Sequence, residues 1–360
     1  MDLVAAGVWM LGALAVFAPL IASNQPLLWC DDAGWASPWL ESLFDRNFYG
    51  SVDVCFNTLL LPGLPLALGA WAGSRRFPRL GSRLVGAAAL VWGLVVLGLV
   101  VFPSSRTYVD WTELPHSFSV FPPVPWSARD GILSQNLESA SVVHLLGTDN
   151  QGRDIFTRLL FGARVSLLIG LVAAALFATI GAVVGTVAGY FGGWVDLLTQ
   201  AVIEVVMCVP ALLLVLAAAA FIEQRSVFHA IGIIAAVSWT GPARLVRAEV
   251  LRLRALDFVA AARAAGFPQH VILLQEVLPN AIGPVFVSAT FGVANAIMME
   301  STLGFLGLGD PSSPSWGQML SLGTAAGDWV QILAPGLAIF LTVALVNLAG
   351  EAVRDAHAAR

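Results

Sequence analysis

Acidic and basic side chains stand close together in the sequence GTDNQGRD, which begins at Gly147. Asp149 and Asp154 flank Arg153, and Gly147 and Gly152 permit the tight turns that would bring the three side chains together. A guanidinium beside carboxylates forms charge-assisted and often bidentate hydrogen bonds. The spacing therefore predicts a hydrogen-bonded clasp of both acids with the arginine.

Two glutamates lie inside strongly apolar stretches, where ionisable side chains are costly and usually functional. Glu204 lies in the stretch 197–222, and Glu300 lies near the end of the stretch 281–303. A proton-coupled carrier would use such acids as proton relays. Because both glutamates are close to the ends of their stretches, we favour a hydrogen bond to a neighbouring helix or a side chain that reaches to the membrane surface.

Other kinds of site lack the residues that they need. The chain has no lysine, which excludes a P-loop nucleotide site and Schiff-base chemistry. Its five histidines show no paired-ligand spacing, and its three cysteines are too far apart for a zinc site, although Cys30 and Cys55 could form a disulfide. A net charge of −5 gives no nucleic-acid signal. We expect no catalytic residue, no metal site and no nucleic-acid partner.

The composition around these residues is that of a membrane protein. Of the 360 residues 58% are hydrophobic and 11% are charged, whereas soluble domains have about 25% charged residues. Helices alone satisfy the backbone of such spans within one segment. We predict an all-α polytopic membrane protein with about eight transmembrane helices, or seven if the sixth stretch, which Pro242 interrupts, does not cross. The apolar stretches occur at 3–23, 54–72, 84–103, 164–190, 197–222, 227–243, 281–303 and 331–350.

Arginines in the short loops predict the orientation of the chain. The loop 73–83 holds four arginines and no acid, and the segment 244–263 holds five more. With eight spans both fall on one side, together with both termini, and the positive-inside rule makes that side the cytoplasm. The segments 24–53 and 104–163 then lie on the external side.

The same pattern divides the chain into regions. We expect an N-terminal region with three spans at 1–103, an external segment at 104–160, a five-span domain at 161–351 and a cytoplasmic tail at 352–360. In the five-span domain small residues recur every four positions, at Gly181, Gly185 and Gly189. Such a stripe lets another helix approach closely, either within this chain or at a contact between subunits.

The segment 255–280 between the sixth and seventh stretches carries local signals for two short helices. Ala260 to Ala265 are good helix formers, Gly266 suits a helix C-terminus, and Pro268 prevents continuation. A second short helix can run from Pro268 to Val277. A helix surface of alanines outside the bilayer fits a groove of another protein, and a plain cytoplasmic loop is the alternative.

This segment resembles the cytoplasmic EAA motif of ABC importer permeases. Its residues match the motif's alanines at Ala261 and Ala262, its glycine at Gly266 and its Leu-Pro at Leu278 and Pro279. Two differences stand beside the match. Ala260 occupies the position of the motif's glutamate, and Gln275-Glu276 replaces an Arg-His pair of many members. The resemblance implies that residues 260–262, 266 and 278–280, the last being Asn280, form the coupling helix that docks onto an ATP-hydrolysing subunit.

Three further stretches resemble the second, C-type permease subunit of dipeptide, oligopeptide and nickel ABC importers. They are HLLGTDNQGRDIFTRLLFGARVSLLIG from His144, ESTLGFLGLGDPSSPSWGQMLSLG from Glu300 and the tail NLAGEAVRDAHAAR. The resemblance covers residues 144–360, whereas residues 24–130 are not matched by the usual six-span members. It implies a type I ABC importer permease core with extra N-terminal spans.

The same resemblance implies partners and a location. A sister permease subunit, two ABC ATPase subunits and an extracytoplasmic solute-binding protein would complete the transporter, in the inner or plasma membrane of a prokaryote. ATP and Mg²⁺ would be bound by the ATPase subunits, and this chain would hold no cofactor. Peptides are the commonest cargo of the family, and nickel or another small solute is the alternative. A proton-coupled secondary carrier is the rival outside the family, although the chain shows no inverted repeat.

Two groups of residues receive roles on the external side. One group forms an external gate or a contact with the solute-binding protein, or else a rigid cap at the start of the fourth span: Gly147, Thr148, Asp149, Gly152, Arg153 and Asp154. The other forms a folded-back loop that lines the pathway: Glu300, Gly304, Gly307, Gly309, Pro314 and Trp316.

Overall fold

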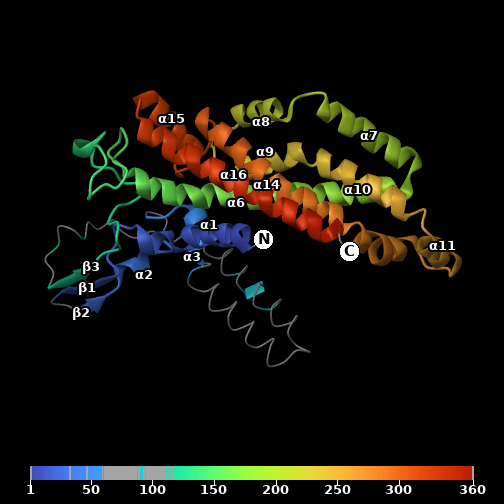
Figure 1. The fold of residues 1–360 in the computed structure, drawn as a ribbon, viewed down its shortest axis with the longest axis horizontal. Coiled ribbons are helices and arrows are strands. Elements are labelled where there is room, and N and C mark those ends of the chain that lie inside the picture. Colours follow the sequence, from blue (N-terminus) through green and yellow to red (C-terminus); the bar gives the residue numbers. More distant parts are fainter. Residues whose placement is uncertain are drawn as a thin grey trace. The chain divides into compact units, whose positions relative to one another are not determined.

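The computed structural model describes residues 2–31, 34–45, 48–58 and 117–358, together with isolated positions between 60 and 114. The long helices are α1 (Asp2–Ile21), α6 (Ile155–Phe191), α14 (Ile282–Phe305) and α16 (Trp329–Ala358) (Figure 1). Shorter helices are α2 (Pro38–Ser42), α3 (Ser51–Thr58), α7 (Gly193–Met207), α8 (Ala211–Ala220), α9 (Val227–Ser238), α10 (Thr240–Leu253), α11 (Asp257–Ala264), α12 (Gln269–Val271), α13 (Leu278–Asn280) and α15 (Trp316–Ala326). A 3₁₀ turn η3 (Leu133–Gln135) and a π-helical stretch η4 (Ile272–Val277) complete the helical elements described.

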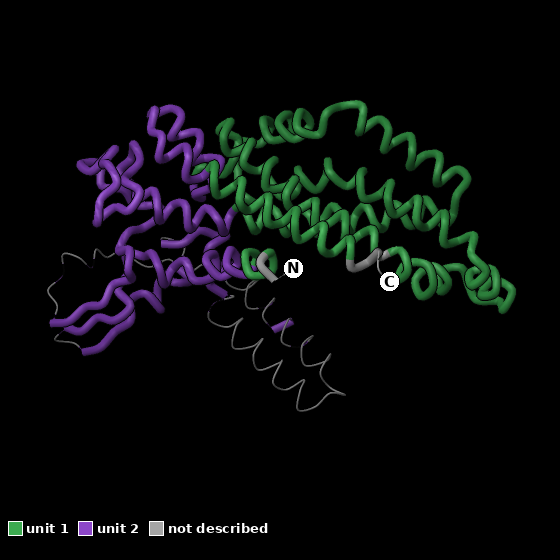
Figure 2. The backbone as a smooth tube through the Cα atoms, viewed as in Figure 1, with its two compact units in different colours: residues 1–8, 166–311, 336–360 green, residues 9–165, 312–335 purple. Residues whose placement is uncertain are grey.

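The chain divides into two compact units, coloured in Figure 2. Unit 1 comprises residues 1–8, 166–311 and 336–360, and unit 2 comprises residues 9–165 and 312–335.

Helices that could cross a bilayer agree in part with the predicted spans. Among the described residues three helices are long and apolar enough, at Val4–Ile21, Ile155–Phe191 and Trp329–Asp355, and five spans result if two bent helix pairs each count as one. The stretch 197–222, predicted as one span, contains two helices, which together can count as one broken span. Helices α7 and α8 are bent by 77° at a break before Ala211, because Pro210 lacks the N–H that would continue α7.

The remaining predicted spans have different outcomes. The stretch 227–243 contains α9, whose 12 residues are fewer than the roughly 20 that a span needs. Helix α14 covers the stretch 281–303. Most of 54–72, all of 73–83 and most of 84–103 lie outside the described residues.

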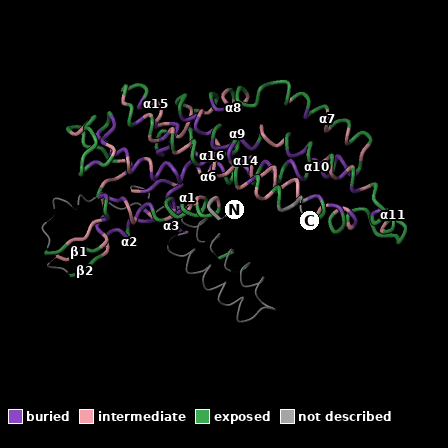
Figure 3. Tube along the Cα trace, viewed as in Figure 1, coloured by how far each residue is buried: buried purple, intermediate pink, exposed green. Residues whose placement is uncertain are grey.

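Figure 3 shows many exposed positions along the helices of unit 1. They include large apolar side chains such as Leu198, Val205 and Leu213 on α7 and α8, and Leu337 and Phe340 on α16. In water so much apolar surface would mark an interaction site. In a chain with the composition of a membrane protein it indicates contact with lipid.

The glycine stripe of α6 is an internal helix contact of unit 1. A Cβ atom on Gly185 would lie 2.4 Å from the carbonyl oxygen of Ala243, and one on Gly189 would lie 2.9 Å from that of Arg247. Gly181 faces Pro242 and the carbonyl of Trp239 in the same way. The stripe therefore allows the backbone of α10 to lie directly against α6. Of the two expectations, a helix contact within this chain or a contact between subunits, the structure shows the first.

Unit 2 contains a small sheet that the sequence did not predict. Its order is β2 (Gly34–Ala36), β1 (Leu28–Asp31), β3 (Phe118–Val120), and both pairings are antiparallel. Strand β1 belongs to the segment 24–53 and β3 to the segment 104–163. The two segments predicted to share one side of the membrane are thus hydrogen-bonded to each other. The thiol of Cys30 is free, so the disulfide with Cys55 is not formed.

Candidate functional site

The predicted pair of short helices exists in unit 1, and its local geometry follows from the sequence. Helix α11 ends in a Schellman motif, in which the N–H of Gly266 donates to the carbonyl of Arg263 (3.0 Å) and that of Phe267 to the carbonyl of Ala262 (3.2 Å). Gly266 adopts φ = +82°, a conformation that glycine reaches without strain. Pro268 then precedes α12, as predicted.

One face of α11 is buried and the other is open. Val259 is fully buried in a cluster with Tyr190, Val250 and Ile272, and the partly buried Ala262 packs against the same cluster. The remaining small residues, Ala260, Ala261, Ala264, Ala265 and Gly266, are exposed. They present a low surface that the bulkier exposed side chains of Phe258, Phe267 and Leu274 border in sequence.

The predicted Leu-Pro-Asn turn is the one-turn helix α13. Leu278 is half-buried, whereas Pro279 and Asn280 are exposed. The Asn280 side-chain amide donates to the carbonyl of Glu276 (2.6 Å), which ties the turn to the end of η4. Ala281 is buried in the same cluster as Val259, so the whole segment from α11 to α14 is anchored at both ends.

The clasp predicted in unit 2 forms with one acid only. The Nε of Arg153 donates to Oδ2 of Asp149 (2.8 Å), and its Nη2 lies 2.7 Å from the same oxygen. The other oxygen of Asp149 accepts the backbone N–H groups of Gln151 and Arg153. Asp149 and Thr148 are fully buried. The hydrogen bonds of the buried Asp149 carboxylate therefore stabilise the loop from Gly147 to Asp154.

Asp154 makes different contacts from those predicted. It is the N-cap of α6, where its Oδ1 accepts the backbone N–H of Thr157 (2.7 Å). Its Oδ2 lies 3.0 Å from Nδ1 of His144. The expectation that Asp154 flanks Arg153 in the clasp was wrong, because the start of α6 directs its carboxylate to the helix end.

The two loop glycines fit the tight turns predicted for them. Gly147 and Gly152 have φ = +80° and +71°. A Cβ on Gly152 would lie 2.0 Å from the carbonyl oxygen of Ile132. With Asp149 and Asp154 buried, the geometry favours the rigid cap over a surface that touches another protein.

Glu300 makes the helix contact that we favoured for it. It is 4% exposed in α14, and the hydroxyl of Ser166 on α6 donates to its Oε2 (3.0 Å). Glu204, in contrast, lies exposed on α7. The described residues hold no group of three or more side chains suited to a metal ion.

The glycines after Glu300 end α14 in a tight turn. Gly307 has φ = +73°, and the N–H groups of Gly307 and Leu308 donate to the carbonyls of Gly304 and Leu303. A Cβ on Gly309 would lie 3.2 Å from the Cα of Gly304. This second Schellman motif ends α14, and the loop from Leu306 to Ser315 follows it.

The end of that loop is anchored in unit 2. Pro314 and Trp316 are buried, and the indole Nε1 of Trp316 donates to the carbonyl of Leu159 on α6 (2.9 Å). Gly162 leaves room for the indole, since a Cβ there would lie 2.8 Å from its Cδ1. Trp316 therefore fixes the start of α15.

The sequence interpretation missed the two buried arginines of α6, Arg158 and Arg164. Arg164 of α6 is 0% exposed, and its Nε donates to the carbonyl of Ala15 in α1 (2.7 Å). Its Nη1 donates to Oδ1 of Asn57 (2.9 Å) and lies 3.3 Å from Oδ1 of Asp53, both in α3. A single charge at the start of an apolar stretch was the signal for it.

Comparisons with known proteins show the family to which this chain belongs. A sequence model of the binding-protein-dependent transport system inner membrane component matches residues 181–360. The dipeptide transport system permease protein DppC of Alkalihalophilus pseudofirmus is 36% identical over 267 residues, which are 73% of this chain and 84% of that protein. The chain belongs to this family. It is the permease component of an ABC importer and a multi-pass membrane protein.

Two other proteins are similar to this permease. A putative peptide transport system permease protein of Brucella suis biovar 1 is 42% identical over 219 residues, 59% of this chain and 72% of the relative. Among solved structures, an inward-facing MetNI methionine ABC transporter chain is 19% identical with a TM-score of 0.46, and the match covers 56% of this chain and 97% of that one. The family also implies ATPase and solute-binding partners for this permease.

Proposed function

We propose that this permease imports short peptides. The proposal is supported by its relatives, since proteins 36% and 42% identical to it are named as dipeptide and peptide permeases. The cargo of a transporter of this kind is largely selected by its solute-binding protein, which is a separate chain. Nickel and other small solutes are therefore the outcomes to compare with peptides in a transport assay.

The segment from α11 to α13 is the proposed docking site for an ATPase subunit. The observation that carries this proposal is the open small-residue face of α11, which ends at Gly266 while its opposite face is packed through Val259. A side chain larger than a methyl group at this face would hold a partner surface away. Ala260, Ala261, Ala262, Gly266, Leu278, Pro279 and Asn280 are the proposed coupling residues.

The nucleotide chemistry is assigned to partner subunits. The chain has no lysine, and a P-loop requires one, so ATP and Mg²⁺ would be bound by two ATPase subunits and this chain would hold no cofactor. A sister permease would complete the pathway. The arginine-rich loops support a cytoplasmic position of the docking segment and of both termini.

These parts give a mechanism with two states. ATP binding closes the ATPase pair, and the docked segment from α11 to α13 (257–280), the coupling segment, moves with it. The helices packed on the coupling segment then change their orientation. On the external side the loop from Gly147 to Asp154 acts as the rigid cap of α6. The loop from Gly304 to Trp316, with Glu300 before it, lines the pathway that accepts the solute.

Substitution of Gly266 tests the docking proposal. Gly266→Arg is expected to leave membrane insertion intact, to prevent co-purification of the ATPase subunits and to abolish ATP-driven uptake. Gly266→Ala is the control. It carries the cost of a left-handed residue, about 1 kcal/mol, but adds only a methyl group in open space. ATPase binding and uptake by Gly266→Arg at the level of Gly266→Ala would refute the docking site.

A further inference from the structure

We propose that three arginines, Arg247, Arg254 and Arg263, link the coupling segment to the corner between α6 and α7 (189–196). When the coupling segment moves, this corner then moves with it. The inference rests on the proposed docking function and names the residues that carry its effect into the membrane helices. All of them lie in unit 1. Three of their partners, Gly189, Tyr190 and Asp196, lie at the end of α6 and the start of α7.

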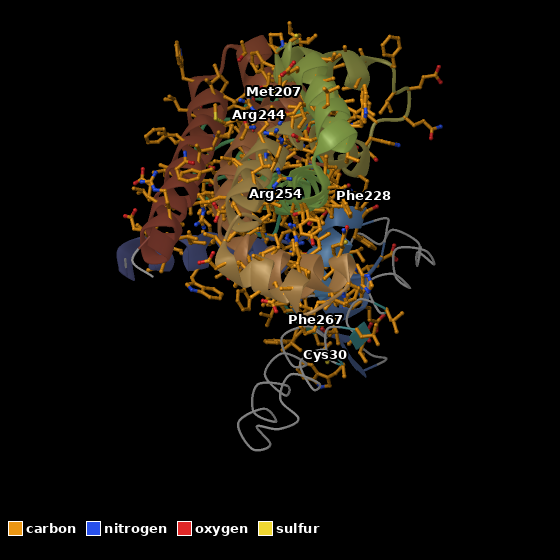
Figure 4. All side chains as sticks on the ribbon, turned by 90° about the vertical axis from the view of Figure 1, so that its right-hand side faces the viewer. Cys30, Met207, Phe228, Arg244, Arg254 and Phe267 are labelled. Carbon is orange, nitrogen blue, oxygen red and sulfur yellow. The ribbon has the colours of Figure 1, made fainter. Side chains whose placement is uncertain are left out.

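Arg254 joins the end of α10 to the end of α6. It is the C-cap residue of α10, and its Nη1 donates to the carbonyl of Gly189 (2.8 Å) and lies 3.4 Å from that of Tyr190. These carbonyls belong to the last turn of α6, where a cation is stabilised by the helix dipole. Figure 4 views this part of unit 1 and labels Arg254 above the exposed Phe267 of the coupling segment.

Arg263 reaches the same turn from α11. Its guanidinium carbon lies 5.7 Å from the centre of the Tyr190 ring, within the range of a cation–π contact. The ring is 5% exposed and belongs to the cluster that holds Val259. The docking helix therefore contacts the end of α6 through both an apolar cluster and a cation.

Arg247 links α10 to the start of α7. Its Nη2 donates to Oδ2 of Asp196 (2.7 Å), and its Nε donates to Oδ1 of the same carboxylate. The hydrogen bonds to Asp196 raise the pKa of the Arg247 guanidinium. A bidentate pair of this kind fixes orientation as well as distance.

Two glycines give the corner between α6 and α7 conformational freedom. Gly192 and Gly193 have φ = +67° and +56°, and nothing lies within 4 Å of a Cβ placed on Gly193. Two successive left-handed glycines leave α7 free to change direction relative to α6. Arg254 and Arg263 hold the α6 side of the corner to α10 and α11, and Arg247 holds its α7 side to α10. Because Val259 of α11 packs in one cluster with Val250 and Leu253 of α10, a displacement of α11 reaches both sides of the corner. A purely structural role would instead affect stability alone.

The experiment measures whether the corner follows the coupling segment. Nitroxide labels on cysteines that replace Trp194, which is 78% exposed, and Phe267, which is 55% exposed, report the distance between them in the assembled transporter, with the native cysteines changed to serine. With Arg254 present, the distance distribution should stay narrow and unchanged when ATP is trapped in the ATPase pair. With Arg254→Gln it should shift or broaden on ATP trapping. The dialanine imported per ATP hydrolysed should fall about tenfold, within the roughly 5–150-fold range of coupling between distant sites.

Matched variants make the result specific. Arg252→Gln removes the same charge two residues away, where the guanidinium pairs with Glu249 of its own helix, and it should behave like the unsubstituted chain. Arg254→Lys should recover part of the coupling. If Arg254→Gln does not assemble, Arg263→Gln serves instead, with an expected loss of about threefold from a cation–π contact.

The outcomes separate the two proposals. An unchanged label distance and an unchanged ratio of dialanine to ATP in an assembled Arg254→Gln or Arg263→Gln transporter would overturn the inference. Failure of the unsubstituted chain to bind ATPase subunits would instead refute the docking function.

Discussion

The guanidinium of Arg164 and the side-chain amide of Asn57 lie 2.9 Å apart, although 107 residues separate them in the chain. The remaining donors of Arg164 reach the carbonyls of Ala15 and Val16 in α1, and Asp53 lies 3.3 Å away. The rings of Phe56 and Phe161 cover the guanidinium at 5.4 and 5.0 Å. One buried cation thus joins α1, α3 and α6, and the N-terminal region that the resemblance left unmatched is tied to α6 through it.

Arg164→Gln is expected to destabilise the protein strongly. Loss of the cation leaves the carboxylate of Asp53 buried without its partner, and removal of one member of a buried pair costs about 3–5 kcal/mol. The unfolding midpoint of the detergent-purified chain measures the effect. Arg354→Gln is the control, because Arg354 is largely exposed. The double variant Arg164→Gln, Asp53→Asn should recover part of the loss, and equal midpoints for Arg164→Gln and Arg354→Gln would contradict the assignment.

Gly185→Ala is expected to disturb the contact of α10 with α6. The new methyl carbon would lie 2.4 Å from a backbone carbonyl oxygen, which cannot move without its helix, so overpacking should cost about 1–3 kcal/mol. Gly241→Ala on α10 is the matched control, because a Cβ there has nothing within 4 Å. Thermal unfolding of both variants tests this. A midpoint for Gly185→Ala at or above that of Gly241→Ala would show that the stripe tolerates side chains.

Local signals explain how much of the coupling segment could be predicted. The alanines before Gly266 favour a helix, Gly266 permits the left-handed turn, and Pro268 starts the next helix, all within ten residues. The same holds for the turn at Gly307 that ends α14. In both places the conformation depends on neighbours in sequence, so the pattern is sufficient.

Features that depend on distant partners could not be predicted in this way. Strand β1 pairs with β3 across some 90 residues, and strands of three or four residues carry too little pattern to show it. Asp149 and Asp154 both stand close to Arg153, and only the start of α6 decides which one pairs with it. An acid directly before an apolar run is itself a helix N-cap signal, and Pro210 is the corresponding signal for the break between α7 and α8.

The cap at Asp154 leads to a third prediction. Asp154→Ala removes the acceptor for the N–H of Thr157 and should destabilise the start of α6 by about 1 kcal/mol. Asp154→Asn retains an acceptor at the N-cap and loses only the charge beside His144, so it should be milder. Hydrogen exchange of the amides of residues 155–158 reports the effect locally. Equal exchange in the two variants would mean that the cap bond does not hold the helix end.

The buried acid of α14 distinguishes an ATP-driven permease from a proton-coupled carrier. Glu300 accepts a hydrogen bond from Ser166, and Glu300→Gln keeps an oxygen that can accept this bond while it removes the proton site. Uptake by reconstituted vesicles should therefore persist in Glu300→Gln, and a protonophore should not reduce it in either protein. Glu204→Gln, on an exposed position of α7, is the control for removal of an acid in the same region of the chain. Vanadate, which arrests the ATPase subunits, should abolish uptake in all three. If instead Glu300→Gln stops uptake and a protonophore stops it in the unsubstituted chain, a proton would be the driving ion, and the assignment of the energy source to ATP would have to be given up.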